Sequence, residues 1–355
     1  MENNLLLLDN MINDLNKNIH KMYVSDYWKN YSLRIQKNIK KYGLSSFRSN
    51  FLIGKGFSDI LHDDPFLYKH ETFKNKIRGI LGSSISKSFP FNILIDQPYK
   101  NLSNGYINNY LKAKSELINL KNHKVLQQFF SEHKDFNTLQ CHPRDTFVFN
   151  NHKIGSSYLS PILTKNIISN EFKKKNYNSF FEIGGGFGAN AHTLLSTIPK
   201  LKKYIYMDIP PMLYIGTQYL RNFFNDSLYD YDDINKLDTI RFKNNDEVEI
   251  YCLAPWQLNK VKSNVDFFFN AHSFQEINFD ILKDYTLYLK KIMNKNNSII
   301  LQFYKYFSDV QNTNDPLKII DLLNQNCNFN LSKKSEAINV EFKSFIMTNF
   351  ITNFE

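Results

Sequence analysis

Cysteine, proline and glycine are scarce in this chain of 355 residues, and each shortage excludes a class of protein. The three cysteines, Cys141, Cys252 and Cys327, lie far apart and form no CxxC pair, which excludes a disulfide framework and a zinc knuckle. With only 10 Pro and 12 Gly, the sequence holds no collagen-like or linker-like run. Few and isolated thiols are typical of a reducing compartment, so we expect a cytoplasmic protein.

Long apolar runs are also missing. The run Leu5–Leu8 has no basic flank before it and is followed closely by acids, unlike a secretory signal. No run approaches the length of a membrane span, so we expect no stable membrane insertion. Hydrophobic residues nevertheless make up 42% of the chain and aromatic residues 15%, which is enough for a sizeable core in two domains.

Acidic residues are outnumbered, 34 against 44 Lys and Arg, which leaves a formal charge of +10. The excess is uneven, because residues 1–150 carry +8 and residues 151–355 carry +2. The lysines are scattered, whereas nucleic-acid binding needs a clustered stripe. We therefore expect no nucleic-acid partner, while an anionic small molecule and a membrane surface both stay open as explanations of the basic front part.

The first 150 residues have the three- and four-residue apolar spacing of amphipathic helices. The pattern predicts helices over residues 5–19, 27–39, 72–81, 106–120 and 123–130. This part is expected to be a mainly helical N-terminal domain, residues 1–150, that serves the substrate, a lid or oligomerisation. A further helix over residues 160–175 leads into the second domain, residues 151–355.

From residue 178 onward, short apolar runs alternate with helical stretches, which is typical of a parallel sheet covered on both faces. The predicted strands are residues 180–183, 204–209, 248–253, 265–270 and 298–304, and the predicted helices are residues 189–197, 211–225 and 279–293. A late strand over residues 339–350 could return antiparallel to an edge. The expected fold is α/β: a doubly wound, Rossmann-like sheet of seven strands with one reversed.

One glycine-rich segment carries chemistry. A strand runs into Gly184, Gly186 and Gly188 and then into a helix, so the backbone can take positive φ angles and let a ligand approach. Asp208 follows at the end of the next strand, beside the glycine turn, where a carboxylate can accept both hydroxyls of a ribose. The combination indicates a nucleoside-binding site.

Two kinds of nucleoside fit this pattern. The string Gly184-x-Gly186-x-x-Ala189 matches the dinucleotide fingerprint, so NAD is one candidate. Glu182 lies two residues before the first glycine, where a dinucleotide strand would normally be apolar. A carboxylate there suits a ligand that carries an ammonium group and no pyrophosphate.

At these residues the sequence resembles the class I S-adenosylmethionine (SAM)-dependent methyltransferases. The segments Glu182–Asn190, Tyr206–Pro211 and Val265–Glu276 are similar, more narrowly, to the bacterial sugar O-methyltransferase family. That narrower resemblance also takes in the less specific segments Tyr27–Trp28 and Tyr42–Arg48. The resemblance implies that the glycine loop holds the methionine part of SAM with support from Glu182, and that Asp208, next to Ile209, takes the ribose hydroxyls. It further implies that Ala254, Pro255 and Trp256 lie near the adenine, although the acidic residue common there is missing.

Ligands in an open α/β sheet lie beyond the carboxyl ends of the strands. The fourth strand should therefore deliver Asn270, His272, Gln275 and Glu276 to the site, with Asn270 on the cofactor side and Gln275 on the substrate side. Methyl transfer to a hydroxyl needs a base, and we expect His272 in that role because its pKa is near neutrality, with Glu276 as second candidate or as the group that orients His272. No cluster has the spacing of metal ligands, so metal-independent transfer is expected.

Three residues near the domain junction are weaker candidates for substrate contact. Ser157 and Tyr158 precede the first strand, in a segment that could form part of a lid, and Arg144 could meet an anionic acceptor. The expected function is transfer of a methyl group from SAM to a sugar hydroxyl of a glycan or nucleotide-sugar precursor. An NAD(P)-dependent oxidoreductase and a non-catalytic binding protein of the same fold remain alternatives, and a homo-oligomer stays open.

Overall fold

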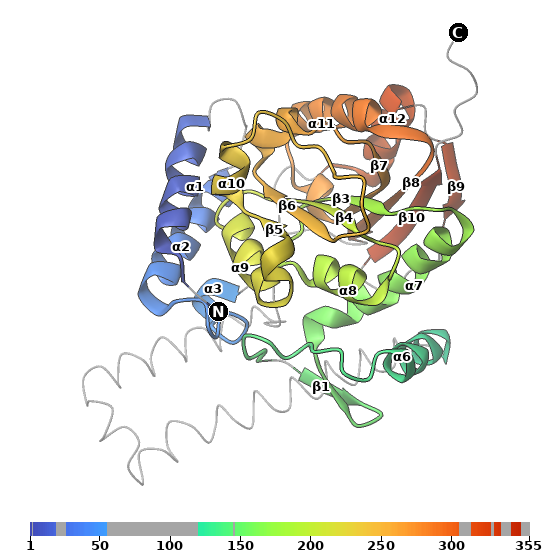
Figure 1. Cartoon of the computed structure of the whole chain (residues 1–355), viewed down its shortest axis with the longest axis horizontal. Helices are drawn as coiled ribbons and strands as arrows, with labels where there is room; N and C mark the ends of the chain where they lie inside the picture. Colours follow the sequence, from blue (N-terminus) through green and yellow to red (C-terminus); the bar gives the residue numbers. More distant parts are fainter. Residues whose placement is uncertain are drawn as a thin grey trace.

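In the part of the chain that the structure describes, a mixed sheet of eight strands forms the centre of the protein (Figure 1). The computed structural model describes residues 1, 3–18, 26–54, 120–144, 146–304, 314–327, 330–334 and 342–348. In spatial order the strands are β5 (Leu228–Tyr229), β6 (Glu249–Leu253), β4 (Lys203–Met207), β3 (Ser179–Ile183), β7 (Val265–Ala271), β8 (Met293–Tyr304), β10 (Phe342–Thr348) and β9 (Asn330–Lys334).

Six of these strands, from β5 to β8, run parallel to one another, and β10 pairs antiparallel with β8. The one reversed strand expected from the late apolar run is therefore present as β10. The expected number of seven strands is wrong for this sheet, because the two-residue strand β5 extends its edge beyond β6. The order of strands changes direction at β3, which lies between β4 and β7.

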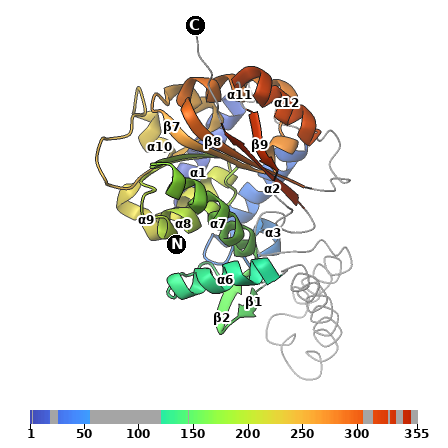
Figure 2. The same ribbon diagram turned by 90° about the vertical axis from the view of Figure 1, so that its right-hand side faces the viewer.

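Helices cover both faces of the sheet, as a doubly wound fold requires (Figure 2). One face carries α7 (Leu159–Lys174), α8 (Ala189–Thr197) and α9 (Met212–Phe224), and the other carries α11 (Phe279–Ile292) and α12 (Pro316–Cys327). The short helix α10 (Tyr231–Asn235) follows β5. The observed limits of α8 coincide with the predicted 189–197, and those of α9 and α11 differ from the predictions by one residue at most.

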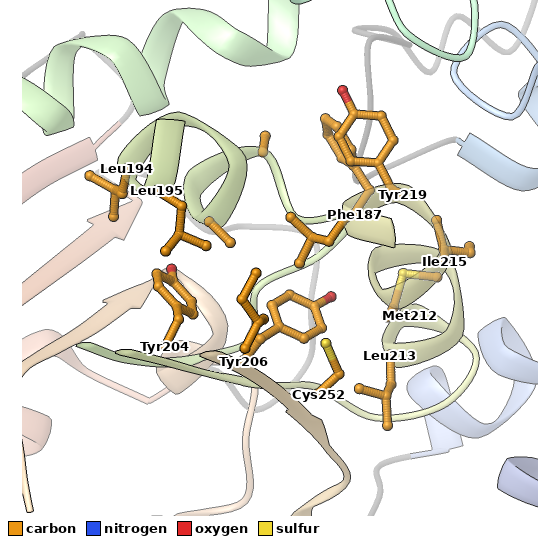
Figure 3. Close-up of a cluster of buried hydrophobic side chains, with 14 of the residues drawn as sticks. Phe187, Leu194, Leu195, Tyr204, Tyr206, Met212, Leu213, Ile215, Tyr219 and Cys252 are labelled. Atoms are coloured by element: carbon orange, nitrogen blue, oxygen red, sulfur yellow. The ribbon is translucent and has the colours of Figure 1, made fainter. Parts of the chain in front are cut away.

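Alternate residues of the parallel strands β3, β4, β6, β7 and β8 belong to two separate cores. Phe180, Tyr204 and Phe267 pack with the core of α7, α8 and α9, whereas Phe181 and Phe268 pack with the core of α11 and α12. Figure 3 shows part of the first core, with Tyr204 and Tyr206 of β4 directed toward the helices. Because both faces are apolar, the strands read as continuous hydrophobic runs in the sequence.

The described N-terminal residues share the first of these cores. They form α1 (Leu5–Asn18), α2 (Asp26–Tyr42), α3 (Phe51–Gly54), α6 (Leu120–Glu132) and the hairpin of β1 (Thr146–Phe149) and β2 (His152–Gly155). Helix α1 is fixed to the sheet domain by hydrogen bonds from the Tyr214 hydroxyl to Asn3 at 2.9 Å and from the Tyr231 hydroxyl to Asp14 at 2.8 Å. The expected division at residues 150 and 151 falls inside the turn of the β1–β2 hairpin.

Two of the predicted N-terminal helices, 72–81 and 106–120, lie outside the described residues, except for Leu120, where α6 begins. None of the helices in the described part of the chain combines the length and the apolar character needed to cross a membrane. Cys141, Cys252 and Cys327 are all buried free thiols.

Candidate functional site

A cavity of about 390 Å³ opens beyond the carboxyl ends of β3, β4 and β7, at the position where the order of strands reverses. The sequence-predicted residues that line it are Gly184, Gly186, Asp208, Ile209, Pro255, His272, Glu276 and Ser157. Described lining residues for which no site role was predicted include Trp28, Ser160, Asn190, Met212, Asn278, Ile281, Tyr285 and Gln302.

The glycine loop between β3 and α8 forms one wall. Gly184, Gly186 and Gly188 have φ angles of 75°, 62° and 90°, in the left-handed region that favours glycine. A Cβ at Gly184 would collide with Ser273, and one at Gly188 would lie 2.9 Å from the Leu220 side chain. At Gly186 an added Cβ would meet no heavy atom within 4 Å, so this glycine faces the open cavity.

Asp208 stands at the end of β4, beside this loop. Its carboxylate accepts hydrogen bonds from the backbone N–H of Gly186 at 2.8 Å and of Ile209 at 2.7 Å. Burial raises the pKa of Asp208 to about 7, the two backbone N–H groups oppose this rise, and the charge of Glu182 adds to it. Each carboxylate oxygen keeps a second lone pair, so Asp208 can accept further hydrogen bonds from a ligand in the cavity.

Glu182 does not line the cavity. It is fully buried and accepts hydrogen bonds from the Tyr204 hydroxyl at 2.7 Å and the Asn190 side-chain amide at 2.9 Å. Burial raises the pKa of Glu182 to about 7, and these two hydrogen bonds act against the rise. Asn190 therefore stands between Glu182 and the cavity, and its Oδ1 is the atom left to accept a hydrogen bond from a ligand.

The segment after β6 contributes less to the cavity than the sequence analysis expects. Pro255 lines the cavity, but Ala254 is fully buried and Trp256 lies outside the lining. The Trp256 indole N–H donates to the Tyr231 hydroxyl at 3.0 Å, and the two rings meet edge to face. The adenine contact of Ala254, Pro255 and Trp256 stays a prediction. Of these three residues, only Pro255 borders the cavity.

Asn270 holds the loop after β7 in place, and Gln275 lies in that loop. The Asn270 side-chain amide donates to the Ile183 carbonyl oxygen at 2.8 Å and to the Ser273 hydroxyl at 2.6 Å, and Asn270 Oδ1 accepts the Phe274 N–H. Gln275 is buried and lies outside the lining. Asn270 thus joins β7 to β3 and shapes the wall without bordering the cavity.

His272 and Glu276 both line the cavity, and burial moves their pKa values in opposite directions. Burial lowers the pKa of His272 to about 3, so the imidazole is neutral at pH 7. Burial and the charge of Asp208 raise the pKa of Glu276 to about 7, while a hydrogen bond from Trp28 lowers it. His272 also has a φ angle of 69°, and its backbone N–H donates to the Gln302 backbone carbonyl oxygen at 2.9 Å.

The three junction residues have three different positions. Ser157 lines the cavity and accepts a hydrogen bond from the Arg48 guanidinium at 3.4 Å. The Tyr158 hydroxyl is buried, 2.6 Å from both His192 Nδ1 and the Tyr219 hydroxyl, so it belongs to the core and not to the cavity wall. Arg144 is exposed and does not border the cavity.

No site role was predicted for the lining residues that come from distant segments. Trp28 on α2 and Gln302 on β8 reach the cavity from opposite ends of the chain. For Asn190 a signal existed, because it follows the glycine loop in the first turn of α8 and so points at the same space. Nothing local in the sequence marks Trp28 as a neighbour of Glu276.

No group of three or more His, Cys, Asp or Glu side chains placed to hold a metal ion occurs among the residues that the structure describes. Among the described lining residues, the titratable groups are two acids, a neutral histidine and Tyr285.

No protein-family model matches the sequence, and no curated protein matches it. Among solved structures, the mitomycin 7-O-methyltransferase MmcR is similar over 54% of this chain and 56% of its own, with 9% identity and a TM-score of 0.38. This chain thus spans about half the length of that protein.

Two further structures match most of their own length. A SAM-dependent methyltransferase from Clostridium acetobutylicum ATCC 824 is similar over 53% of this chain and 91% of its own, with 12% identity and a TM-score of 0.37. The magnesium protoporphyrin IX methyltransferase ChlM from Synechocystis PCC 6803, with bound SAM, is similar over 64% of this chain and 97% of its own, with 8% identity and a TM-score of 0.36.

Proposed function

We propose that this chain binds SAM and transfers its methyl group to a hydroxyl of a small-molecule acceptor, a sugar of a glycan or nucleotide-sugar precursor. The observation that carries the proposal is the meeting of Gly186 and Asp208 at one cavity beyond the parallel strands. The buried free thiols are consistent with a cytoplasmic place of action.

The residues present fit the cofactor in size and in charge. Gly186 leaves space where any other residue would project a side chain into the cavity. The charged groups of the described lining are Asp208 and Glu276, and no Lys or Arg occurs in that part of the lining. Two acids without a cation favour a ligand that carries positive charge, as the sulfonium and ammonium groups of SAM do.

Each of these residues has a distinct task. Asp208 accepts hydrogen bonds from the ribose hydroxyls. Asn190 accepts a hydrogen bond from the ammonium group through Oδ1, while Glu182 holds the Asn190 side-chain NH2 group. The glycine loop leaves room for the ligand backbone. When bound, SAM supplies an electrophilic methyl group. The protein adds positioning, which can contribute roughly 7–11 kcal/mol, and removal of the proton from the acceptor hydroxyl.

The structure favours Glu276 over His272 as the group that accepts this proton. A base works best when its pKa is near the operating pH, and Glu276 meets this condition with a pKa of about 7. With a pKa of about 3, His272 is neutral but a weak base, so it suits orientation of the acceptor through a ring nitrogen. We therefore propose Glu276 as the base and His272 as its neighbour on the acceptor side.

A sugar acceptor is consistent with the neutral polar side chains of the lining. Ser157, Ser160, Asn278 and Gln302 offer hydroxyl and amide groups to a ligand rich in hydroxyls. The described lining offers no cation to a phosphate, so the sugar ring itself is the part that we expect in the cavity.

Isothermal titration calorimetry with S-adenosylhomocysteine tests the cofactor. We expect binding to the native chain, and a loss of at least tenfold in affinity for Asp208→Ala, whose circular dichroism should stay native. NADH is the matched competitor, because an oxidoreductase would bind it in preference. Binding of NADH alone, or unchanged affinity in Asp208→Ala, would contradict the proposal.

The acceptor is tested with SAM labelled in its methyl group and an extract of cell-surface glycan precursors. We expect label in a carbohydrate product, reduced at least a hundredfold by Glu276→Gln. A chain that binds S-adenosylhomocysteine but labels nothing in broad acceptor pools would instead be a binding protein of this fold.

A further inference from the structure

Trp28 brings the N-terminal helix α2 into the cavity. It is half-buried, lines the cavity, and lies about 250 residues before Glu276 in the sequence. The apolar side of α2 is buried at Tyr31, Ile35 and Ile39, which follow one another at four-residue steps, and Trp28 lies three residues before Tyr31. Trp28 is the preceding position of the same stripe, so the packing of α2 directs it inward.

The contacts of Trp28 join it to the proposed base. Its ring meets Tyr31 edge to face, with centroids 5.2 Å apart and an interplanar angle of 78°. The side chain makes a hydrogen bond with Glu276, and because an indole N–H can only donate, the carboxylate accepts. This bond stabilises the ionised carboxylate against burial and against the charge of Asp208.

We propose that Trp28 is an acceptor-site residue: its indole N–H positions the Glu276 carboxylate at the cavity, and its ring forms the wall against which a ring-shaped acceptor packs. The second part rests on the proposed methyl transfer. A pyranose suits this wall, because its apolar C–H face can lie on an aromatic ring while its hydroxyls reach Ser157, Ser160 and Gln302.

Several other groups can influence Glu276. Among the described side chains, Asp208 at the end of β4, His272 on the same loop and Tyr285 on α11 share the cavity with it. Asp208 is the one whose titration overlaps that of Glu276, since the pKa of His272 is lowered to about 3 and that of Tyr285 is raised. Any test of the contact must therefore separate Glu276 from Asp208.

The two tryptophans of the chain make such a test direct, because a Trp256→Phe background leaves Trp28 as the single indole fluorophore. We expect its emission to change with a midpoint near pH 7. The change should disappear in Trp256→Phe/Glu276→Gln and persist in the matched control Trp256→Phe/Asp208→Asn. A transition that survives Glu276→Gln unchanged, or no transition between pH 5 and 9, would overturn the proposed contact.

The acceptor role is tested in methyl transfer to the glycan-precursor extract. Trp28→Phe keeps a ring and removes the N–H, so the pKa of Glu276 should rise, the rate at pH 7 should fall severalfold, and a higher pH should restore it. Trp28→Ala should weaken acceptor binding at least tenfold and leave S-adenosylhomocysteine affinity within about twofold. Unchanged pH profiles and acceptor binding in both variants would overturn the role.

The two proposals can fail separately. If the native chain transfers no methyl group, the proposed function fails, while the fluorescence titration still decides whether Trp28 holds Glu276. If methyl transfer occurs but the pH dependence of Trp28 emission is the same with and without Glu276→Gln, the inference fails and the proposed function stands.

Discussion

The two ends of the parallel sheet treat buried carboxylates in opposite ways. At the amino end, Lys203 of β4 and Glu249 of β6 form an ion pair of 2.6 Å, and both side chains are 3% exposed. Lys203 also donates to Asn245 at 2.7 Å and to the Glu247 carbonyl oxygen at 3.0 Å, so its three N–H groups are all used. Tyr251 donates to the other oxygen of Glu249 at 3.0 Å.

At the carboxyl end, the acids have neutral donors in place of a cation. Asp208 accepts from two backbone N–H groups, Glu182 from a hydroxyl and an amide, and Glu276 from Trp28. The pKa values of all three are raised to about 7. At the amino end, which we call the complete end, the buried charges are paired within the protein. At the carboxyl end, which we call the open end, a positively charged ligand would stabilise the ionised acids.

The largest expected effect comes from breaking the complete end. Glu249→Gln leaves the buried Lys203 without its charge partner, which should reduce the free energy of unfolding by about 3–5 kcal/mol. Urea denaturation followed by circular dichroism measures the loss. The double variant Lys203→Met/Glu249→Leu removes both charges and should recover most of it. A loss below about 1 kcal/mol in Glu249→Gln would show that the pair does not matter.

The glycine loop should separate stability from binding at the open end. A Cβ at Gly185 would collide with the Tyr206 ring, so Gly185→Ala should cost about 1–3 kcal/mol of unfolding free energy. Gly186→Ala meets open space and costs only the strain of its φ of 62°, about 1–2 kcal/mol, but it should abolish measurable S-adenosylhomocysteine binding. Equal binding by wild type and Gly186→Ala would refute the assignment of this glycine to the ligand.

Stability should depend on pH through the acids of the open end. The pKa values of Asp208 and Glu276 rise from 3.8 and 4.5 to about 7 on folding, so the folded chain binds more protons than the unfolded chain between these values. Their contribution to the free energy of unfolding therefore decreases as the pH rises from about 4 to 7, on the order of 1 kcal/mol or more for each. Denaturation at several pH values measures it.

Asp208→Asn is the matched variant for this slope and should flatten it. The affinity for SAM, which has a sulfonium charge, should also rise relative to that for S-adenosylhomocysteine as the pH rises through 7. A slope that is identical in Asp208→Asn would place the titration elsewhere.

The smallest expected effect concerns His272, whose contribution to stability should change with pH in the opposite direction to that of Asp208 and Glu276. Its pKa falls from 6.5 to about 3 on folding, so its contribution to stability is lost as the pH falls from about 6.5 toward 3. His272→Asn tolerates the left-handed φ and should remove this acid sensitivity, a gain of about 1 kcal/mol or less at pH 5 relative to pH 8. Thermal melts at both values measure it, and a larger acid loss in the variant would contradict the burial of His272.

Short-range chemistry explains what the sequence could predict. The glycine turn, the limits of α8 and the place of Asp208 follow from backbone conformation and strand order, which neighbouring residues determine. The alternation of side chains along β3 could not show that Glu182 lies outside the cavity lining, because helices cover both faces of the sheet and both faces are apolar. Asn190 therefore reaches the cavity where Glu182 was expected.

Long-range packing explains the rest. Tyr158 has the sequence position of a lid residue, but His192 on α8 and Tyr219 on α9 bind its hydroxyl within the core. Trp28 and Glu276 meet only because α2 packs across the sheet domain, and no local pattern encodes that contact. The hairpin of β1 and β2 is a local element, in contrast, and its turn lies at the predicted division between residues 150 and 151.

The cavity takes its walls from both α2 and β8, and this has a consequence for biosynthesis. The ribosome synthesises Trp28 about 270 residues before Gln302, which is an interval of roughly 15–55 s at common elongation rates. During that interval a nascent chain lacks a complete pocket, so ligand in the cell cannot stabilise it. Only a chain that extends past Gln302 can gain from ligand binding by mass action, and a translation product that ends before Gln302 should remain a substrate for proteases whatever the ligand concentration.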